Sequence, residues 1–307
     1  MPPEKRTSGL RPPPRVVVVT RESEYELLLR RHATHAQAAF FLENRGQEIG
    51  TVHTQHLAFQ AVKQQVVTAI PTRWRRSLLG RDDLSRFVFD QSDIVVALGQ
   101  DGLVANLAKY LRGQTVIGIN PSPERNDGVL VRHRPEHAAR LLEATFAGRI
   151  EVEQRTMVAA RLDDGQILLA LNEVFIGHRS HQSARYRLRY QGTEERQSSS
   201  GIIAASGTGS SGWARSINGE RAQPLSLPQP EARRLAFFVR EPFPSVATGT
   251  SVTGGVLGGG DHLEVISEFN EGGVIFGDGV EDDYLDFAFG MTATVQVAET
   301  FLQLAHP

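Results

Sequence analysis

Residues 92–120 read SDIVVALGQDGLVANLAKYLRGQTVIGIN. An apolar run from Ile94 to Leu98 ends in the turn GQDG at 99–102, and a second apolar run follows from Val116 to Ile119. Apolar residues recur between the runs at the spacing of one helix face: Leu103, Val104, Leu107, Ala108 and Leu111. The pattern predicts a strand, a glycine turn, a helix and a second strand.

Asp101 stands between two glycines, where the predicted strand ends and the helix begins. Ligands of open α/β sheets bind at this edge of the sheet, and glycines before a helix N-terminus favour a phosphate. A carboxylate repels a phosphate, so the acid needs another explanation. We expect Asp101 to take a proton from a hydroxyl group or to hold a metal ion.

The composition excludes several classes of protein. The chain has 307 residues, a net charge of -2 and no cysteine, which argues against nucleic-acid binding, disulfides and cysteine-ligated zinc. No apolar run reaches the roughly 20 residues that span a bilayer. Residues 1–14 contain several prolines and lack the apolar core of a signal peptide, so we expect a flexible tail and a cytoplasmic protein.

Residues 15–148 have the pattern of an α/β domain. The run Val16–Val19 suits a central strand covered on both faces, and residues 23–44 predict helix with a possible break after Thr34. Residues 47–80 are harder to interpret: they fit a strand and a helix, or His53 and His56 at helical spacing as metal ligands. The basic run TRWRR at 72–76 is expected to face solvent.

From residue 149 to 297 alternating patterns and glycine turns predict a mainly β domain. Ile167 to Ile176 is expected to be one strand that contains Asn172 and Glu173, and Tyr284 to Val297 another. Residues 298–307 are expected to pack back on the first domain as a helix or a strand. The predicted architecture is a Rossmann-like α/β domain and a β-sandwich-like domain, with the site between them.

Polar residues interrupt the apolar β pattern at three places. Asn172-Glu173 must face a cavity or be buried with partners, because burial without partners is costly. The loop SGTGS at 206–210 offers hydroxyl and amide groups that suit a phosphate or a ribose, although a linker has a similar composition. The turn Gly277-Asp278-Gly279 is predicted to be a hairpin turn and nothing more.

Taken in order, these segments resemble the NAD kinase family. That family has a GGDGT turn, a GIN segment, an NE pair and a TPTGSTAY loop, and this chain has GQDGL at 99–103, GIN at 118–120, NE at 172–173 and SGTGS at 206–210. VIGINPSPERNDGVL, ALNEVFIG and SSSGIIAASGTGSSGW are closest to the mitochondrial-type branch. The resemblance covers roughly residues 90–297.

The resemblance implies an α/β and β fold, a homodimer or homotetramer, and transfer of a phosphoryl group to the 2′-hydroxyl of NAD. Asp101 would be the general base, Mg²⁺ would accompany ATP, and no protein ligand to the metal is assigned. The implied donor-phosphate contacts are Gly99, Gln100, Gly102 and Arg125. The implied NAD contacts are Asn172, Glu173, Ser206, Gly207, Thr208, Gly209 and Ser210.

Two residues of the turn depart from the family pattern. Gln100 replaces a glycine and Leu103 replaces a threonine, which affects the phosphate-donor side, while Asn172-Glu173 on the acceptor side is intact. Two other functions therefore stay open. One is a weakly active or inactive dinucleotide-binding protein, and the other is a kinase for a different hydroxyl acceptor, such as a lipid or a sugar.

Overall fold

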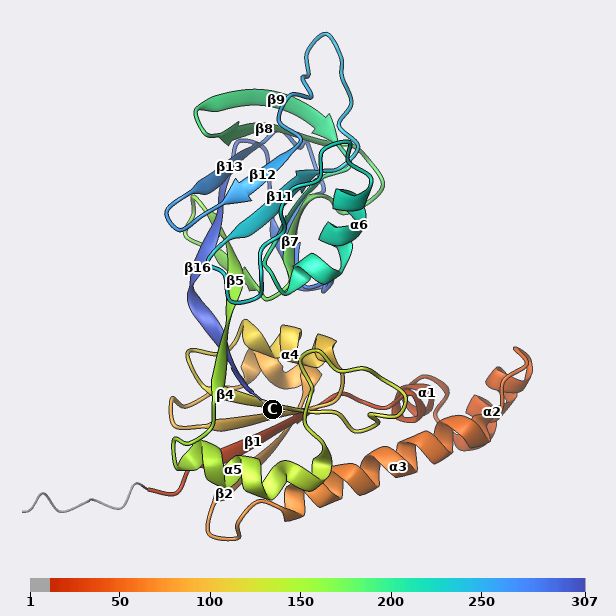
Figure 1. Cartoon of the computed structure of the whole chain (residues 1–307). Helices are drawn as coiled ribbons and strands as arrows, with labels where there is room; N and C mark the ends of the chain where they lie inside the picture. The colour runs from red at the N-terminus through yellow and green to blue at the C-terminus, as the bar shows by residue number, and fades with distance from the viewer. Residues whose placement is uncertain (1–11, 307) are drawn as a thin grey trace, which may run out of the picture.

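The computed structural model describes residues 12–306, so most of the expected tail lies outside the described residues. Two domains are joined by the long strands β5 and β16 (Figure 1). In the first domain, four parallel strands follow the order β2 (Arg75–Gly80), β1 (Arg15–Thr20), β3 (Ile94–Leu98) and β4 (Thr115–Ile119). Its helices are α1 (Glu24–His32), α2 (His35–Glu43), α3 (Ile49–Thr68), α4 (Asp101–Ala108) and α5 (Ala138–Phe146), with short 3₁₀ helices at Arg81–Arg86 and Pro135–His137.

Strand β1 is buried on both faces, as its run of valines predicts. Val17 and Val19 pack in the cluster that includes α4, whereas Val16 and Val18 pack in the cluster that includes α3 and α5. Figure 1 shows α4 on the side of this sheet that faces the second domain. The parallel sheet with helices on both faces confirms the α/β prediction and brings the start of α4 to the domain boundary.

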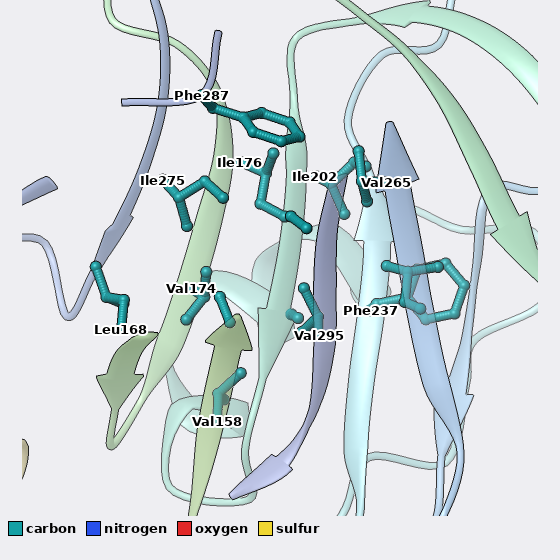
Figure 2. Packing of buried hydrophobic residues seen from close by; sticks show 14 of the residues in the cluster. Val158, Leu168, Val174, Ile176, Ile202, Phe237, Val265, Ile275, Phe287 and Val295 are labelled. Atoms are coloured by element: carbon teal, nitrogen blue, oxygen red, sulfur yellow. The ribbon is translucent and has the colours of Figure 1, made fainter. Parts of the chain in front are cut away.

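The second domain is formed by two packed β layers. One is a six-stranded antiparallel sheet with the order β12-β11-β10-β7-β14-β15. The other is built around β16, β13, β8 and β9, with β5 beside β16 and β6 beside β5. Figure 2 shows the apolar core between the layers, including Ile176, Phe237 and Val265. This arrangement confirms the β-sandwich-like prediction. The bounds are β5 (Val152–Leu162), β6 (Ile167–Ala170), β7 (Glu173–His178), β8 (Ala184–Tyr190), β9 (Thr193–Ser199), β10 (Ile202–Ala205), β11 (Leu235–Val239), β12 (Gly254–Leu257), β13 (His262–Ser267), β14 (Gly273–Gly277), β15 (Tyr284–Asp286) and β16 (Thr292–Ala305), with a 3₁₀ turn at Gly209–Ser211 and α6 (Trp213–Gly219).

Strand β16 belongs to both parts of the molecule. Residues Ala293–Val297 pair with β5 inside the second domain, and Phe301–Ala305 pair with the start of β5 after a change of register. Gln303 and Leu304 also lie parallel to β4 of the first domain. The end of the described chain is therefore a strand in the first domain's sheet.

Two segments were each predicted to form one strand. Both predictions were wrong, because each segment forms two strands that belong to different sheets. The segment expected from Ile167 to Ile176 forms β6 beside β5 and β7 beside β10, so the chain changes sheet at 171–172. Tyr284 to Val297 likewise divides into β15 and β16. An apolar run does not reveal where the chain crosses from one sheet to the other, because both halves of the run have the composition of a buried strand.

The segment 47–80 contains the long helix α3 and the edge strand β2. The expectation that the whole TRWRR run faces solvent was wrong for Trp74, which is 5% exposed and packs against Phe146 with 5.1 Å between ring centroids. His53 and His56 lie beside Tyr25 on α1. Among residues 12–306, no three or more His, Asp or Glu side chains form a group suited to a metal ion, and no helix is long and apolar enough to cross a membrane.

Candidate active site

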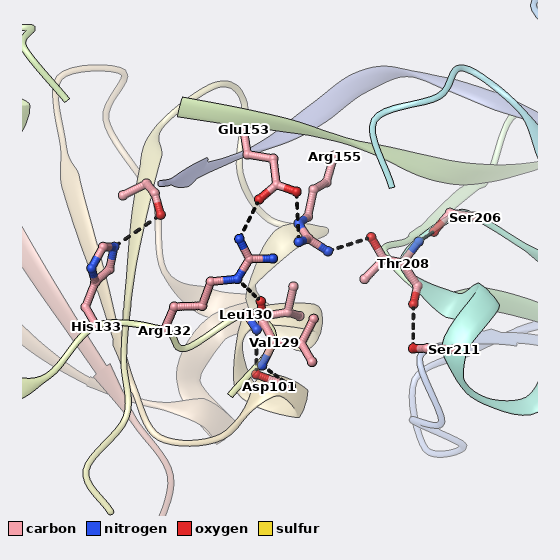
Figure 3. Close-up of polar contacts among 11 residues, drawn as sticks. Asp101, Val129, Leu130, Arg132, His133, Glu153, Arg155, Ser206, Thr208 and Ser211 are labelled. Carbon is pink, nitrogen blue, oxygen red and sulfur yellow. Dashed lines mark hydrogen bonds and ion pairs between the residues drawn. The ribbon is translucent and has the colours of Figure 1, made fainter. Parts of the chain in front are cut away.

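The carboxylate of Asp101, the first residue of α4, holds the loop that follows Gly128 (Figure 3). Its Oδ2 accepts the backbone N–H of Val129 at 3.0 Å, and its Oδ1 accepts those of Leu130 at 2.7 Å and Val131 at 3.1 Å. A carboxylate offers about four acceptor positions. The three amides therefore fix the orientation of the acid and leave one position for another donor.

The two departures in the glycine turn have different structural consequences. Gln100 has φ -106° and ψ 169°, an extended conformation that needs no glycine. Leu103 is 4% exposed and packs in the first domain's core, and a Cβ on Gly99 would lie 3.0 Å from its Cδ2. Leu103 therefore contributes to core packing, and the backbone of the turn tolerates Gln100.

A cavity of about 840 Å³ opens beside the turn, a size typical of small-molecule sites. Gly99, Gln100 and Gly102 line it together with Arg125 from the loop after β4. The structure thus brings together all of the residues assigned to the phosphate donor. Helix α3, which the sequence did not define, supplies part of the opposite wall, including Val52, Thr54, Gln55, His56, Ala58, Phe59 and Val62.

A second cavity, of about 480 Å³, lies between the domains. Val129 contributes from the loop that Asp101 holds, and Gly207, Thr208 and Ser210 contribute from the SGTGS loop. Asp101 itself lines neither cavity, but its neighbours Gln100 and Gly102 line the larger one, and Val129, whose N–H it accepts, lines the second.

Ser206 and Gly209 support the SGTGS loop from the protein side. Ser206 is fully buried, and its hydroxyl donates to the carbonyl of Leu171 at 2.5 Å and accepts the N–H of Thr208 at 3.1 Å. A Cβ on Gly209 would lie 2.3 Å from the carbonyl oxygen of Asn172. The loop thus needs glycine because it passes against the backbone of the NE segment, and neither residue lines the cavity.

Asn172 and Glu173 lie where the chain changes sheet, and Asp278 holds that crossing. The Asp278 carboxylate accepts the backbone N–H groups of Leu171 at 2.9 Å and Asn172 at 2.6 Å. Asp278 has φ 55°, in the left-handed region. The prediction of a simple hairpin turn missed this role, and its only signal in the sequence is an acid between two glycines.

Burial raises the pKa of both acids at this crossing. The pKa of Glu173 is raised to about 7, first by burial and then by the negative charge of Asp278. Burial raises the pKa of Asp278 to about 6, against the opposing effect of the backbone N–H groups that it accepts. Glu173 therefore titrates close to neutral pH, where a change of its charge alters what it can bind.

A network of charged side chains that the sequence analysis missed links the two loops (Figure 3). Arg155 on β5 is 1% exposed, forms an ion pair of 2.9 Å with Glu153, and donates to the hydroxyl of Thr208 at 3.3 Å. Glu153 also pairs with Arg132 at 3.2 Å, and Arg132 donates to the carbonyl of Val129 at 2.6 Å. The network connects the loop held by Asp101 to the SGTGS loop across the domain boundary.

No protein-family model matches the chain. A protein of Oryza sativa subsp. japonica described as a probable NADH kinase is 24% identical over 223 residues, or 65% of this chain and 66% of that protein. The mitochondrial NAD kinase 2 of Rattus norvegicus is 28% identical over 262 residues, or 69% of this chain and 62% of the rat protein. The matches thus span slightly less than two thirds of these relatives' own length.

Among solved structures, the NAD kinase from Archaeoglobus fulgidus in complex with ATP has a similar fold, with a TM-score of 0.56 at 21% identity over 95% of this chain and 93% of that one. The fold and the cavities define a two-domain α/β and β protein with one cavity beside the glycine turn and another between its domains. The motifs, the curated relatives and the shared fold agree: the chain is similar to proteins described as NAD or NADH kinases.

Proposed function

We propose that the protein transfers a phosphoryl group from ATP to the 2′-hydroxyl of the adenosine ribose of NAD, giving NADP. The observation that carries this proposal is that residues next to Asp101 line one cavity, while Val129, which donates its N–H to Asp101, lines the other. A phosphate donor in the larger cavity and a ribose in the inter-domain cavity would meet at this carboxylate. The names of the curated relatives support the same reaction.

In this reaction Asp101 acts as the general base. Its three backbone donors keep it oriented, and the remaining acceptor position receives the ribose hydroxyl. A positioned base contributes about 10²–10⁴-fold to the rate, and the rest of phosphoryl transfer depends on positioning and charge neutralisation. The role of general base thus explains why a carboxylate stands at a strand end that a phosphate must also approach.

The donor phosphates occupy the larger cavity beside Gly99, Gln100 and Gly102, with Arg125 neutralising part of their charge. Mg²⁺ in proteins is commonly held by substrate phosphates and one or two carboxylates. We therefore propose that it enters as the complex with ATP. Carboxylates of Glu22, Glu24 and Glu124 line the same cavity and offer oxygen ligands.

On the acceptor side, Asn172 and Glu173 hold the dinucleotide from the point where the chain changes sheet. Gly207, Thr208 and Ser210 line the inter-domain cavity. Asn172 and Glu173 do not line it, but the SGTGS loop passes against the Asn172 backbone at Gly209, so both segments are placed to contact one ligand. Ser206 and Gly209 act through the loop that they support.

The test is NADP formation from Mg-ATP and NAD, measured with an NADP-specific dehydrogenase for the wild type and for Asp101→Asn. We expect the variant to lose at least about 100-fold in kcat while it still binds NAD and unfolds cooperatively. Asp127→Asn is the matched control, because Asp127 is exposed in the same loop region. It should keep wild-type turnover.

A wild-type rate in Asp101→Asn would exclude the carboxylate as base. If the wild type binds NAD but forms no NADP with ATP or with polyphosphate, the protein is a dinucleotide-binding protein instead. If it neither binds nor converts NAD, the acceptor is a different hydroxyl compound.

We also propose that the protein is a homo-oligomer. Phe243 is 66% exposed and Val246 is fully exposed in the loop between β11 and β12 at the top of Figure 1, and exposed apolar side chains are common at subunit interfaces. Phe243→Ser with Val246→Ser should lower the mass measured by light scattering, with little change in unfolding of each chain. An unchanged mass would show that other surfaces hold the subunits together.

A further inference from the structure

The inter-domain cavity has an excess of positive charge. Arg132 follows the loop held by Asp101, Arg155 lies on β5, and Arg215 lies on α6, and all three line the cavity. Among residues 12–306, Glu153 is the only acid that lines it. Asp101, whose charge also acts on Arg155, adds a second carboxylate. Two carboxylates thus face three guanidinium groups from three separate segments of the chain, so the cavity keeps a positive excess that is suited to an anion.

Arg155 has a donor group that the described residues do not satisfy. Its two Nη atoms contact Glu153 and Thr208, but its buried Nε has no hydrogen-bond partner among residues 12–306. A buried donor without a partner costs free energy. Because Arg155 belongs to the cavity wall, an acceptor on a bound ligand would remove this cost.

The two remaining guanidinium groups are not fully neutralised either. Glu153 divides its oxygens between Arg132 and Arg155, so one negative charge serves two positive ones. Arg215 is exposed and forms no ion pair within the described part of the chain. Planar guanidinium groups bind phosphate oxygens in pairs, which makes arginine the usual residue for phosphate recognition.

We propose that Arg132, Arg155 and Arg215 form a binding site for a phosphate group of the dinucleotide. The identity of the dinucleotide rests on the proposed function. Two groups have the required chemistry: the pyrophosphate that NAD and NADP share, and the 2′-phosphate that only NADP carries. The hydroxyl of Thr208, which accepts from Arg155, supplies a neutral donor to the remaining oxygens at the same wall.

The experiment measures dissociation constants of NAD, NADP and inorganic pyrophosphate by calorimetry. Arg215→Gln should weaken binding of a phosphate-bearing ligand about tenfold, the effect of one charge-assisted hydrogen bond, and Arg215→Lys should weaken it less. Arg134→Gln is the matched control, since Arg134 is exposed near the same loop but does not line the cavity. Arg132→Gln is a second, independent variant.

Equal losses for NAD and NADP support the pyrophosphate as the bound group, and a loss for NADP alone supports the 2′-phosphate. Wild-type affinities for all three ligands in both Arg215→Gln and Arg132→Gln overturn the site. If the wild type forms no NADP, the proposed function fails, but pyrophosphate still decides this proposal. Pyrophosphate binding by the wild type that is lost in the two variants supports the anion site. A wild type that does not bind pyrophosphate overturns it.

Discussion

Replacing Glu173 by glutamine should stabilise the protein at alkaline pH and weaken its binding of NAD. The side chain is mostly buried beside Asp278, and its pKa is raised from 4.5 to about 7 by burial and by that negative charge. Between pH 4.5 and 7 the folded chain therefore binds more protons than the unfolded chain. The free energy of unfolding must fall as the pH rises through this interval.

The difference between 4.5 and about 7, at 1.36 kcal/mol per pKa unit, amounts to about 3 kcal/mol by pH 8. Glutamine has the same shape and no charge, so Glu173→Gln should be up to about 3 kcal/mol more stable than the wild type at pH 8. Near pH 4, where Glu173 is protonated in both states, the two proteins should be similar. The KM for NAD should rise, because an acceptor of the binding site has lost its charge.

Urea unfolding at pH 5, 6, 7 and 8 measures this effect. Glu143→Gln, on the exposed face of α5, is the control and should stay within about 0.5 kcal/mol of the wild type at every pH. Parallel pH profiles for the wild type and Glu173→Gln would refute the argument, since they would show that Glu173 does not titrate between pH 4.5 and 7 in the folded protein.

Two further substitutions test the glycines and the altered turn. Gly209→Ala should destabilise the protein by about 1–3 kcal/mol in urea unfolding, because the added Cβ would lie 2.3 Å from the Asn172 carbonyl oxygen. Gly102→Ala should be neutral or slightly stabilising, because no atom lies within 4 Å of the added Cβ. Equal effects of the two substitutions would contradict the close approach at Gly209. Gln100→Gly should lower the KM for ATP and leave the KM for NAD unchanged in steady-state kinetics, because the side chain lines only the larger cavity. An unchanged KM for ATP would show that Gln100 does not limit donor binding.

The sequence predicted the parts of the site that depend on short segments. The run from Ile94 to Leu98, the turn and helix α4 were predicted correctly, because strand propensity, glycine and helical spacing all act within a few residues. The break after Thr34 was also confirmed, and Thr34 caps α2 by accepting the N–H of Gln37. Local chemistry decided each of these elements.

The missed features depend on contacts between distant segments. Asp278 accepts the backbone N–H groups of two residues that lie more than 100 positions earlier in the chain. Nothing in the sequence near the turn therefore indicates its role. Arg155 is buried only because strand β5 runs along the domain boundary, where Glu153 and Thr208 meet it. The division of Ile167–Ile176 between two sheets likewise depends on which distant strands pair with each half.

The pairing of β16 with β4 has a consequence for the order of folding. Gln303 and Leu304 pair with β4, and the four parallel strands that end at β4 all lie before residue 120. During synthesis, which generally folds domains from the N-terminus, the edge of β4 stays uncovered until Gln303 and Leu304 have been made. Contacts so far apart in sequence form slowly. We therefore expect the first domain to reach its final stability only after the second domain has folded and has brought β16 back to it.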